Sequence, residues 1–138
     1  MPFSRRAPEL TLDNEFFWSG VSDGQLLIQR CDACGAERHP PSPRCPACLS
    51  PKWTAQSLEP RAEVYSYTVV HHPVPTGFTA PYVVALLQWP SGARIVTDLM
   101  DVDPADVAIG MPVEIRMVEV DPGVTLPLAY PVREDADA

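Results

Sequence analysis

Residues 31–48 read CDACGAERHPPSPRCPAC and contain all four cysteines of the chain. The cysteines form two C-x-x-C pairs, Cys31 with Cys34 and Cys45 with Cys48, separated by ten residues. Two such pairs can bring four thiolates onto one tetrahedral ion, at Zn–S distances of about 2.3 Å. The segment between them is rich in proline and polar residues and has little to bury. We therefore expect one bound metal ion to organise it.

The same cysteine spacing serves zinc ribbons and rubredoxin-type iron sites. Iron sites usually follow each pair with a small residue in a left-handed turn, and Gly35 fits after the first pair. Leu49 follows the second pair, which favours zinc. Four protein ligands leave no open position for water, so the predicted zinc is structural. The nearby His39 is then redundant as a ligand, and we expect a surface or loop histidine.

The composition is that of a globular domain. With 138 residues, 46% of them hydrophobic and 20% charged, the chain is enough for one ordinary domain or two very small ones sharing an interface. No apolar run is long enough to span a bilayer, and MPFSRRAPEL lacks the apolar stretch of a secretory signal. Paired thiols without an export signal favour a reducing cytoplasm.

A helix is predicted from Thr11, which can cap it, to Gly20 or Gly24. It follows a loose arm at residues 1–10. Residues 16–18 (FFW) form a dense aromatic cluster on this short helix. Two readings stay open for the cluster: it packs on the body of the protein, or it contacts a partner or an acyl chain.

The remaining pattern is that of short β-strands. Strands at 24–30 and 53–58 would flank the cysteine segment, and 59–61 reads as a linker. Five further strands are expected at 63–70, 82–89, 94–100, 113–120 and 126–132. A proline-bracketed loop, PVPTGFTAP, separates the first two of these. Five short strands with turn signals between them favour a small closed barrel, most commonly an OB-fold.

Two of the barrel strands carry more specific expectations. In the first, strict alternation places Val64 and Val70 on one face and Tyr65, Tyr67 and Val69 on the other. The second, 82–89, is nearly all apolar, so we expect it to be buried on both faces.

The barrel half of the sequence is acidic. Residues 62–138 contain three basic and eleven acidic residues and carry the whole net charge of −8. OB-folds often bind single-stranded nucleic acid through basic grooves and stacking aromatics. Because such affinity comes mainly from Lys/Arg–phosphate contacts, this surface disfavours nucleic acid.

No catalytic constellation stands out in the sequence. His71 and His72 end the first barrel strand, where a general base is conceivable because histidine titrates near neutral pH. No serine or cysteine nucleophile, carboxylate pair or glycine-rich phosphate loop completes a site. We expect a structural or interface role for this pair.

In their order along the chain, the motifs resemble one family. They are EFFWSGVSDGQLLIQRC at 15–31, CDACG at 31–35, HPPSPRCPAC at 39–48, VYSYTVVHHP at 64–73, PYVVALLQW at 81–89 and IGMPVEI at 109–115. The sequence resembles the zinc-ribbon/OB-fold family, described as acyl-CoA-associated and long known as a domain of unknown function. The likeness covers about residues 12–131. It departs at Leu49, where the family often has glycine, and at 61–63, where Gly-x-Gly is common.

The resemblance implies a mainly β fold: an N-terminal helix and rubredoxin-like zinc ribbon at 1–60 and a five-stranded OB-fold barrel at 61–133. The tail at 134–138, beyond the likeness, is expected to be disordered. The resemblance also implies a non-catalytic subunit that stabilises a thiolase-like acyl-CoA enzyme and helps to form its CoA-thioester channel. The enzyme expected is a lipid-transfer-protein-like aldolase of steroid or other lipid side-chain breakdown. A stand-alone acyl-CoA binding module and a nucleic-acid-binding protein are the alternatives.

The expected functional residues fall into two sets. The metal set is the four cysteines with one structural zinc. The residues expected to face a partner or acyl-CoA are Phe16, Phe17, Trp18, Arg38, Arg44, Tyr67, His71 and His72.

Overall fold

The computed structural model describes residues 5–133, and the tail predicted at 134–138 lies outside them. Its elements are α1 (Glu15–Ser22), β1 (Leu27–Cys31), β2 (Glu37–Arg38), β3 (Trp53–Ser57), β4 (Arg61–Val70), β5 (Tyr82–Gln88), β6 (Arg94–Leu99), the 3₁₀ turn η1 (Pro104–Asp106), β7 (Pro112–Asp121) and β8 (Val124–Pro131). All strands expected from the sequence are present, and the two-residue β2 is additional. No helix of the described residues is both long and apolar enough to cross a membrane.

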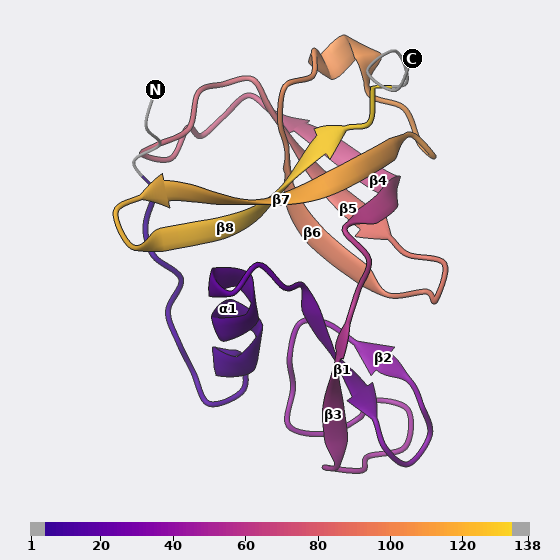
Figure 1. Ribbon diagram of the computed structural model, residues 1–138. Coiled ribbons are helices and arrows are strands. Elements are labelled where there is room, and N and C mark those ends of the chain that lie inside the picture. Colours follow the sequence, from indigo (N-terminus) through magenta and orange to yellow (C-terminus); the bar gives the residue numbers. More distant parts are fainter. Residues whose placement is uncertain (1–4, 134–138) are drawn as a thin grey trace.

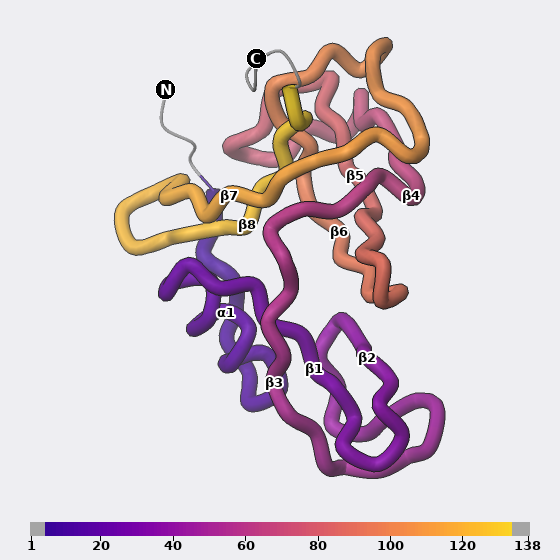
Figure 2. The backbone as a smooth tube through the Cα atoms, turned by 45° about the vertical axis from the view of Figure 1, so that its right-hand side comes forward, coloured from indigo at the N-terminus to yellow at the C-terminus, as the bar shows by residue number. Residues whose placement is uncertain are grey.

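The strands form two separate sheets (Figure 1). The first is a three-stranded sheet in the order β2-β1-β3, with both pairs antiparallel. The second is a closed barrel in the order β4-β5-β6-β8-β7. The predicted ribbon and five-stranded barrel are thus confirmed. Figure 2 shows α1 and the ribbon below the barrel, with the chain passing from β3 directly up into β4.

The helix begins later than the sequence predicts. Asn14, not Thr11, is its N-cap, and its first residue is Glu15. Thr11 instead closes the preceding turn, where its amide donates to Asn14 Oδ1 over 2.8 Å and its hydroxyl oxygen accepts from the Asn14 amide over 3.2 Å. Past the helix end, Gly24 has a φ of 80°, a conformation that glycine adopts at little cost.

The N-terminal arm is attached to the barrel, contrary to the loose arm that we expected. Arg5 forms an ion pair with Asp98 of β6. Its guanidinium also lies 3.8 Å from the ring centroid of Phe78, in the loop between β4 and β5. These contacts bring the start of the described chain against the middle of the barrel. Residues 1–4 of the expected arm lie outside the described part.

A β-bulge in β4 makes the expected strict alternation wrong. Val64 pairs with Leu87 and Ser66 with Leu86, so the ladder shifts by one residue at Tyr65. Val64 and Val69, an odd number of residues apart, therefore both pack in the core. A bulge adds one residue to one strand without changing local propensity, so period-two counting cannot locate it.

The burial of β5 also differs from expectation. Its residues alternate between buried and half-buried, with Val83, Ala85 and Leu87 on the buried face. The outer face keeps partial exposure because no second layer covers this side of the barrel completely. The run of apolar residues reads as a doubly buried strand, but only one face is fully buried.

The helix closes a gap in the barrel wall. The parallel pair β6–β8 has a single ladder position, Leu99 with Ala129. Along the rest of this seam lies a cavity of about 240 Å³, lined by residues of β6 and β8 and by Arg5, Phe17, Trp18 and His39. Phe17 is 4% exposed and belongs to the same core cluster as the barrel residues. Helix, ribbon and barrel thus share one core.

Candidate metal centre

The four cysteine sulfurs converge at the end of the ribbon opposite the barrel. All four Sγ atoms lie within 4.8 Å of one another. Cys31 Sγ is 3.5 Å from Cys48 Sγ, and Cys34 Sγ is 3.6 Å from Cys45 Sγ. A tetrahedron with metal–sulfur arms of about 2.3 Å has edges of about 3.8 Å. These sulfurs therefore fit a single zinc ion, with two of the cysteines buried and two exposed.

The two cysteine knuckles share one backbone geometry. After each pair the next amide turns back to the first cysteine: Gly35 N donates to Cys31 O over 2.9 Å and Leu49 N donates to Cys45 O over 2.8 Å. The φ angles of Gly35 and Leu49 are 78° and 68°, both left-handed. Leu49 thus takes the conformation expected of a glycine. Its identity therefore does not separate zinc from iron, contrary to the argument from the sequence.

Backbone amides prepare the sulfurs for a cation. A hydrogen bond from the Cys34 amide, against the effect of burial, helps to lower the pKa of Cys31 to about 6. The Cys48 amide lowers the pKa of Cys45 in the same way. The Ser50 amide also lowers the pKa of Cys48, but the Cys31 sulfur, burial and the other sulfurs outweigh it and raise that pKa to about 11. A divalent ion relieves this repulsion between sulfurs, because it prefers all its ligands as thiolates.

A buried polar clamp holds the loop between the knuckles. Gln29, 1% exposed, accepts a hydrogen bond from Ser42 N over 2.8 Å and donates to Ser42 O over 3.1 Å. Arg38 Nη2 donates to the same carbonyl over 3.0 Å. Arg38, 7% exposed, offers little surface to a partner in this arrangement. Sequence reasoning missed Gln29, whose only signal is a polar residue in the apolar stretch LLIQRC.

The aromatic side chains of α1 pack mainly against other residues of the same chain. The Phe16 ring lies 4.7 Å from that of Trp53 in the ribbon, and Phe17 lies 4.9 Å from the His39 ring. Trp18 meets the edge of Phe17 at 5.0 Å and lines the seam cavity. These contacts support the reading in which the helix packs on the body. His39 is part of this packing and lies outside the cysteine cluster.

The other residues expected to face a partner are exposed but scattered. Arg44 donates to Leu49 O over 3.0 Å beside the second knuckle. Tyr67 is 37% exposed on β4. His71 and His72 lie exposed after β4, and within the described chain neither side chain has a hydrogen-bonding partner. The structure does not gather these residues into one site, and their partner-facing role stays a prediction.

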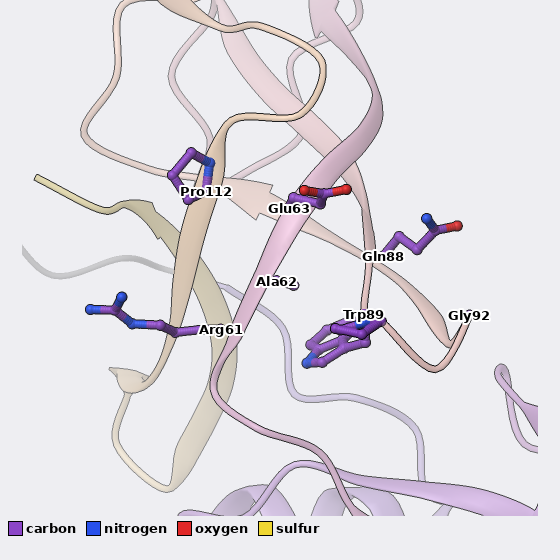
Figure 3. Close-up of a pocket in the computed structure, with 8 residues that line it drawn as sticks. Arg61, Ala62, Glu63, Gln88, Trp89, Gly92 and Pro112 are labelled. Carbon is purple, nitrogen blue, oxygen red and sulfur yellow. The ribbon is translucent and has the colours of Figure 1, made fainter.

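A surface pocket on the barrel, of about 480 Å³, shows no catalytic set (Figure 3). Glu63, Gln88 and Trp89 lie on one side of β4, whereas Arg61 points to the other side. The indole N–H of Trp89 is not free to bind a ligand, since Nε1 donates to Glu59 O over 2.7 Å. The lining holds no nucleophile–base pair and no paired carboxylates.

Three of the four barrel arginines contact neighbouring groups. Arg94 lies 3.8 Å from the ring centroid of Tyr65, and Arg116 lies 4.3 Å from that of Tyr130. Arg133 donates to a backbone carbonyl over 3.0 Å. Arg61, at the start of β4, is exposed. With eleven acidic residues against few arginines in this half of the chain, the surface disfavours nucleic acid.

Two family models match adjacent parts of the chain. Residues 18–54 match the rubredoxin-like zinc ribbon domain of ChsH2, and residues 55–118 match the C-terminal OB-fold domain of ChsH2. The ribbon match identifies the metal of the cysteine cluster as structural zinc.

Curated relatives fall into two groups. The "Probable enoyl-CoA hydratase alpha subunit" of Thermomonospora curvata is 43% identical over 127 residues, covering 92% of this chain and 40% of the relative. The "3-oxo-4,17-pregnadiene-20-carboxyl-CoA hydratase alpha subunit" of Mycobacterium tuberculosis is 38% identical over 118 residues, covering 86% and 38%. The chain thus spans about two fifths of these relatives. A "DUF35 domain-containing scaffold protein" of Methanocaldococcus jannaschii is 38% identical over 101 residues, covering 70% of this chain and 71% of the relative.

Solved structures give the same family. A chain of the "Ltp2-ChsH2(DUF35) aldolase" superposes with a TM-score of 0.83 at 44% identity, covering 90% of this chain and 98% of that one. A DUF35 protein from Sulfolobus solfataricus superposes with a TM-score of 0.63 at 17% identity, covering 88% and 86%, and shows the fold alone. The two family models, the near-complete match to the aldolase chain and the scaffold-protein relative lead to one conclusion: this chain belongs to the ChsH2/DUF35 family of zinc-ribbon and OB-fold proteins.

Proposed function

We propose that the chain is a non-catalytic accessory subunit of a thiolase-superfamily acyl-CoA enzyme, an aldolase of steroid or other lipid side-chain breakdown. It binds and stabilises the catalytic subunit and helps to form the channel for the CoA thioester. The observation that carries this proposal is the match to the ChsH2 chain of an aldolase, which it covers over 98% of its length. We place the complex in the cytoplasm, where reduced cysteines can bind zinc.

The metal centre supports a structural role. Four cysteine ligands fill the coordination of zinc, so no position remains for a water or a substrate oxygen. The ion instead fixes the two knuckles, the clamp at Ser42 and, through β1 and β3, the surface against which α1 packs. Chemistry on a thioester would then depend on groups of the partner.

The hydratase names of two relatives point to a neighbouring reaction on the same class of substrate. They belong to proteins of which this chain spans about two fifths, and a ribbon and barrel account for that share. We therefore propose a shared accessory module, and attribute hydration to no residue of this chain.

A stand-alone acyl-CoA module is the second candidate. Against it, the aromatic rings of α1 already pack on Trp53 and His39, and Arg94 and Arg116 of the barrel already lie on tyrosines. The acyl chain would have to displace the aromatic contacts, and the phosphates of CoA would have to displace the arginine contacts. Tight binding of acyl-CoA by the purified chain alone would favour this candidate over the accessory role.

Purification of the tagged chain from its native cell tests the proposal. We expect a thiolase-like protein to co-purify in a fixed ratio and to survive size-exclusion chromatography. The matched control is the same chain with Cys45→Ser, which should lose both zinc and the partner. Recovery of the wild-type chain alone would contradict the proposal.

A further inference from the structure

The ribbon sheet has one long open edge, at β3. In the order β2-β1-β3, the inner side of β3 pairs with β1, and the structure describes no strand on its outer side. The opposite edge, β2, is two residues long. Strands β4 to β8 close into a barrel. Open edges are usually blunted by charges, proline, bulges or shortness, because their free backbone groups recruit other strands.

Within β3 itself these protective features are absent, although Pro51 and Lys52 directly precede the strand. Its sequence, WTAQS, has no charge and no proline. Its register with β1 runs without a shift from Leu27 with Ser57 to Cys31 with Trp53. All of its residues after Trp53 are exposed. The edge formed by β3 is therefore regular, uncharged and, beyond the half-buried Trp53, exposed.

The hydrogen-bond pattern shows which groups point outward. Leu58 N donates to Leu26 O over 2.8 Å, and Asp32 N donates to Lys52 O over 3.0 Å. Antiparallel ladders alternate between bonded and non-bonded pairs, so Thr54 and Gln56 also bond inward to β1. The N–H and C=O groups of Trp53, Ala55 and Ser57 therefore point away from the sheet, three donors and three acceptors in a row.

A groove lies over β3, the end of β1 and the first knuckle. It measures about 750 Å³ and is lined by residues 54–57 of β3 and by residues 30–35, which run from the end of β1 into the knuckle. Strand addition uses both features: backbone hydrogen bonds supply affinity, and a neighbouring pocket that takes alternate side chains supplies specificity.

The charge of Arg30 indicates which kind of segment would fit the groove. Arg30 is exposed, lines the groove and has no ion-pair partner among residues 5–133. Its guanidinium lies over the first knuckle, where a Cβ on Gly35 would be 3.1 Å from Nη2. Asp32 also lines the groove, and its Oδ1 accepts a hydrogen bond from the Thr54 hydroxyl over 2.7 Å. An acidic side chain entering the groove would therefore find its partner in Arg30.

We propose that the outer edge of β3 receives an extended segment of the partner subunit, which adds a fourth strand to the ribbon and directs an acidic side chain toward Arg30. This inference rests on the proposed accessory function and names the surface that performs it. The ribbon is then a template for the partner's backbone, held in shape by its zinc.

Ala55→Pro is the direct test, because it removes an outward N–H and no bond to β1. Proline is tolerated at edge positions whose N–H faces solvent. Ala55→Val, which keeps the N–H, is the matched control. With purified partner, we expect at least a tenfold higher Kd for Ala55→Pro than for Ala55→Val, with equal zinc content. An equal Kd for the two folded variants would overturn the inference. Arg30→Gln should raise Kd several-fold and Arg30→Lys less.

If Ala55→Pro loses its zinc, amide hydrogen exchange on the wild-type chain tests the same edge. On complex formation, the amides of Trp53, Ala55 and Ser57 should gain protection, whereas Thr54 and Gln56 are protected already. No gain at the outward amides would overturn the inference and leave the accessory function standing. A wild-type chain that does not bind the partner would overturn both. Protection arising from self-association, seen as a dimer by sedimentation, would assign the edge to a second copy instead.

Discussion

At the scale of single residues, Leu49 and His39 occupy positions that ordinary propensities disfavour. Leu49 completes the second knuckle with a φ of 68° although its side chain is 67% exposed and packs on little. His39 is half-buried against Phe17, and burial lowers its pKa to about 4. Each makes a measurable contribution to stability.

Replacing Leu49 with glycine should stabilise the protein. A left-handed conformation costs a residue with a Cβ about 1–2 kcal/mol, and the greater freedom of glycine in the unfolded chain cancels part of that gain. We expect Leu49→Gly to raise the free energy of unfolding by about 0.5–1 kcal/mol in urea titrations of the zinc-bound chain. Leu49→Ala keeps the Cβ and is the control. A glycine variant no more stable than the alanine variant would refute this account of the knuckle.

His39 should make stability fall in weak acid. Its pKa is about 4 in the folded chain against an ordinary 6.5, so the unfolded chain takes up a proton first as the pH drops. No contribution is expected above pH 6.5, where both states are neutral, and the loss grows between pH 6.5 and 4. Solvent screening of the partly exposed ring reduces the loss to about 1–2 kcal/mol.

The comparison is with His39→Gln, which lacks the titrating group. Acid release of zinc affects both proteins, so the difference between their unfolding free energies isolates His39. That difference should change between pH 6.5 and 4. A pH-independent difference would show that His39 titrates normally in the folded chain.

At the scale of elements, α1 serves as part of the barrel wall. Its Phe17 reaches the seam where β6 and β8 share one ladder position, while Phe16 faces the ribbon at Trp53. The zinc-bound ribbon supports the helix from the other side. A change in the stability of the ribbon should therefore reach the β6–β8 seam through α1, and a change at the seam should reach the ribbon.

Truncation of Phe17 should weaken helix and barrel together. Its ring is 4% exposed, and removal of a buried phenylalanine costs about 3–5 kcal/mol. We expect Phe17→Ala to lower the unfolding free energy by that amount and to accelerate amide exchange in β6. Phe16→Ala, on the half-buried ribbon side, should cost less and spare β6. Unchanged exchange in β6 of Phe17→Ala would show that the seam closes without the helix.

Loss of a buried zinc ligand should unfold the ribbon. Structural zinc sites supply much of the folding free energy of such small sheets. Cys45, which is fully buried, is the sharpest choice. We expect Cys45→Ser to lose its zinc by elemental analysis and the amide protection of β1 and β3. Retention of one zinc per chain would mean that the four sulfurs do not form the site.

The sequence indicates these elements unevenly, for physical reasons. The cysteine spacing predicts the ribbon because metal ligands restrict a short segment strongly, and turn residues delimit the barrel strands. The bulge at Tyr65 carries no local signal, since it depends on the pairing of β4 with β5 about twenty residues away. The left-handed turn at Leu49 follows from the local knuckle, but the residue type there does not reveal it. The aromatic cluster of α1 allowed two readings, because a buried ring and a docking ring look alike in a sequence.

At the scale of the whole molecule, helix, ribbon and barrel behave as one body around a shared core. An acidic barrel, two of whose arginines lie on tyrosine rings, adjoins a ribbon that ends in an open edge, β3, without charged residues. This arrangement suits a subunit that positions another protein rather than one that binds a polyanion.

The barrel should not stand alone. Residues 61–133 lack α1, so the β6–β8 seam would be open to solvent and to other chains. We expect this fragment to associate or aggregate in size-exclusion chromatography, whereas residues 5–133 remain a discrete species. A monomeric fragment with a cooperative unfolding transition would contradict the role of the helix as a wall of the barrel.

The role proposed for this chain is that of a zinc-stabilised accessory subunit of a thiolase-like enzyme. Native mass spectrometry of the chain mixed with the thiolase-like protein of its own cell tests this role most directly. We expect a hetero-oligomer in which each copy of this chain carries one zinc, and, in a parallel assay, cleavage of a carbon–carbon bond of the acyl-CoA only when the partner is present. A spectrum of the unassociated chain, alone or with acyl-CoA bound, or cleavage of the acyl-CoA by the chain alone, would contradict this role.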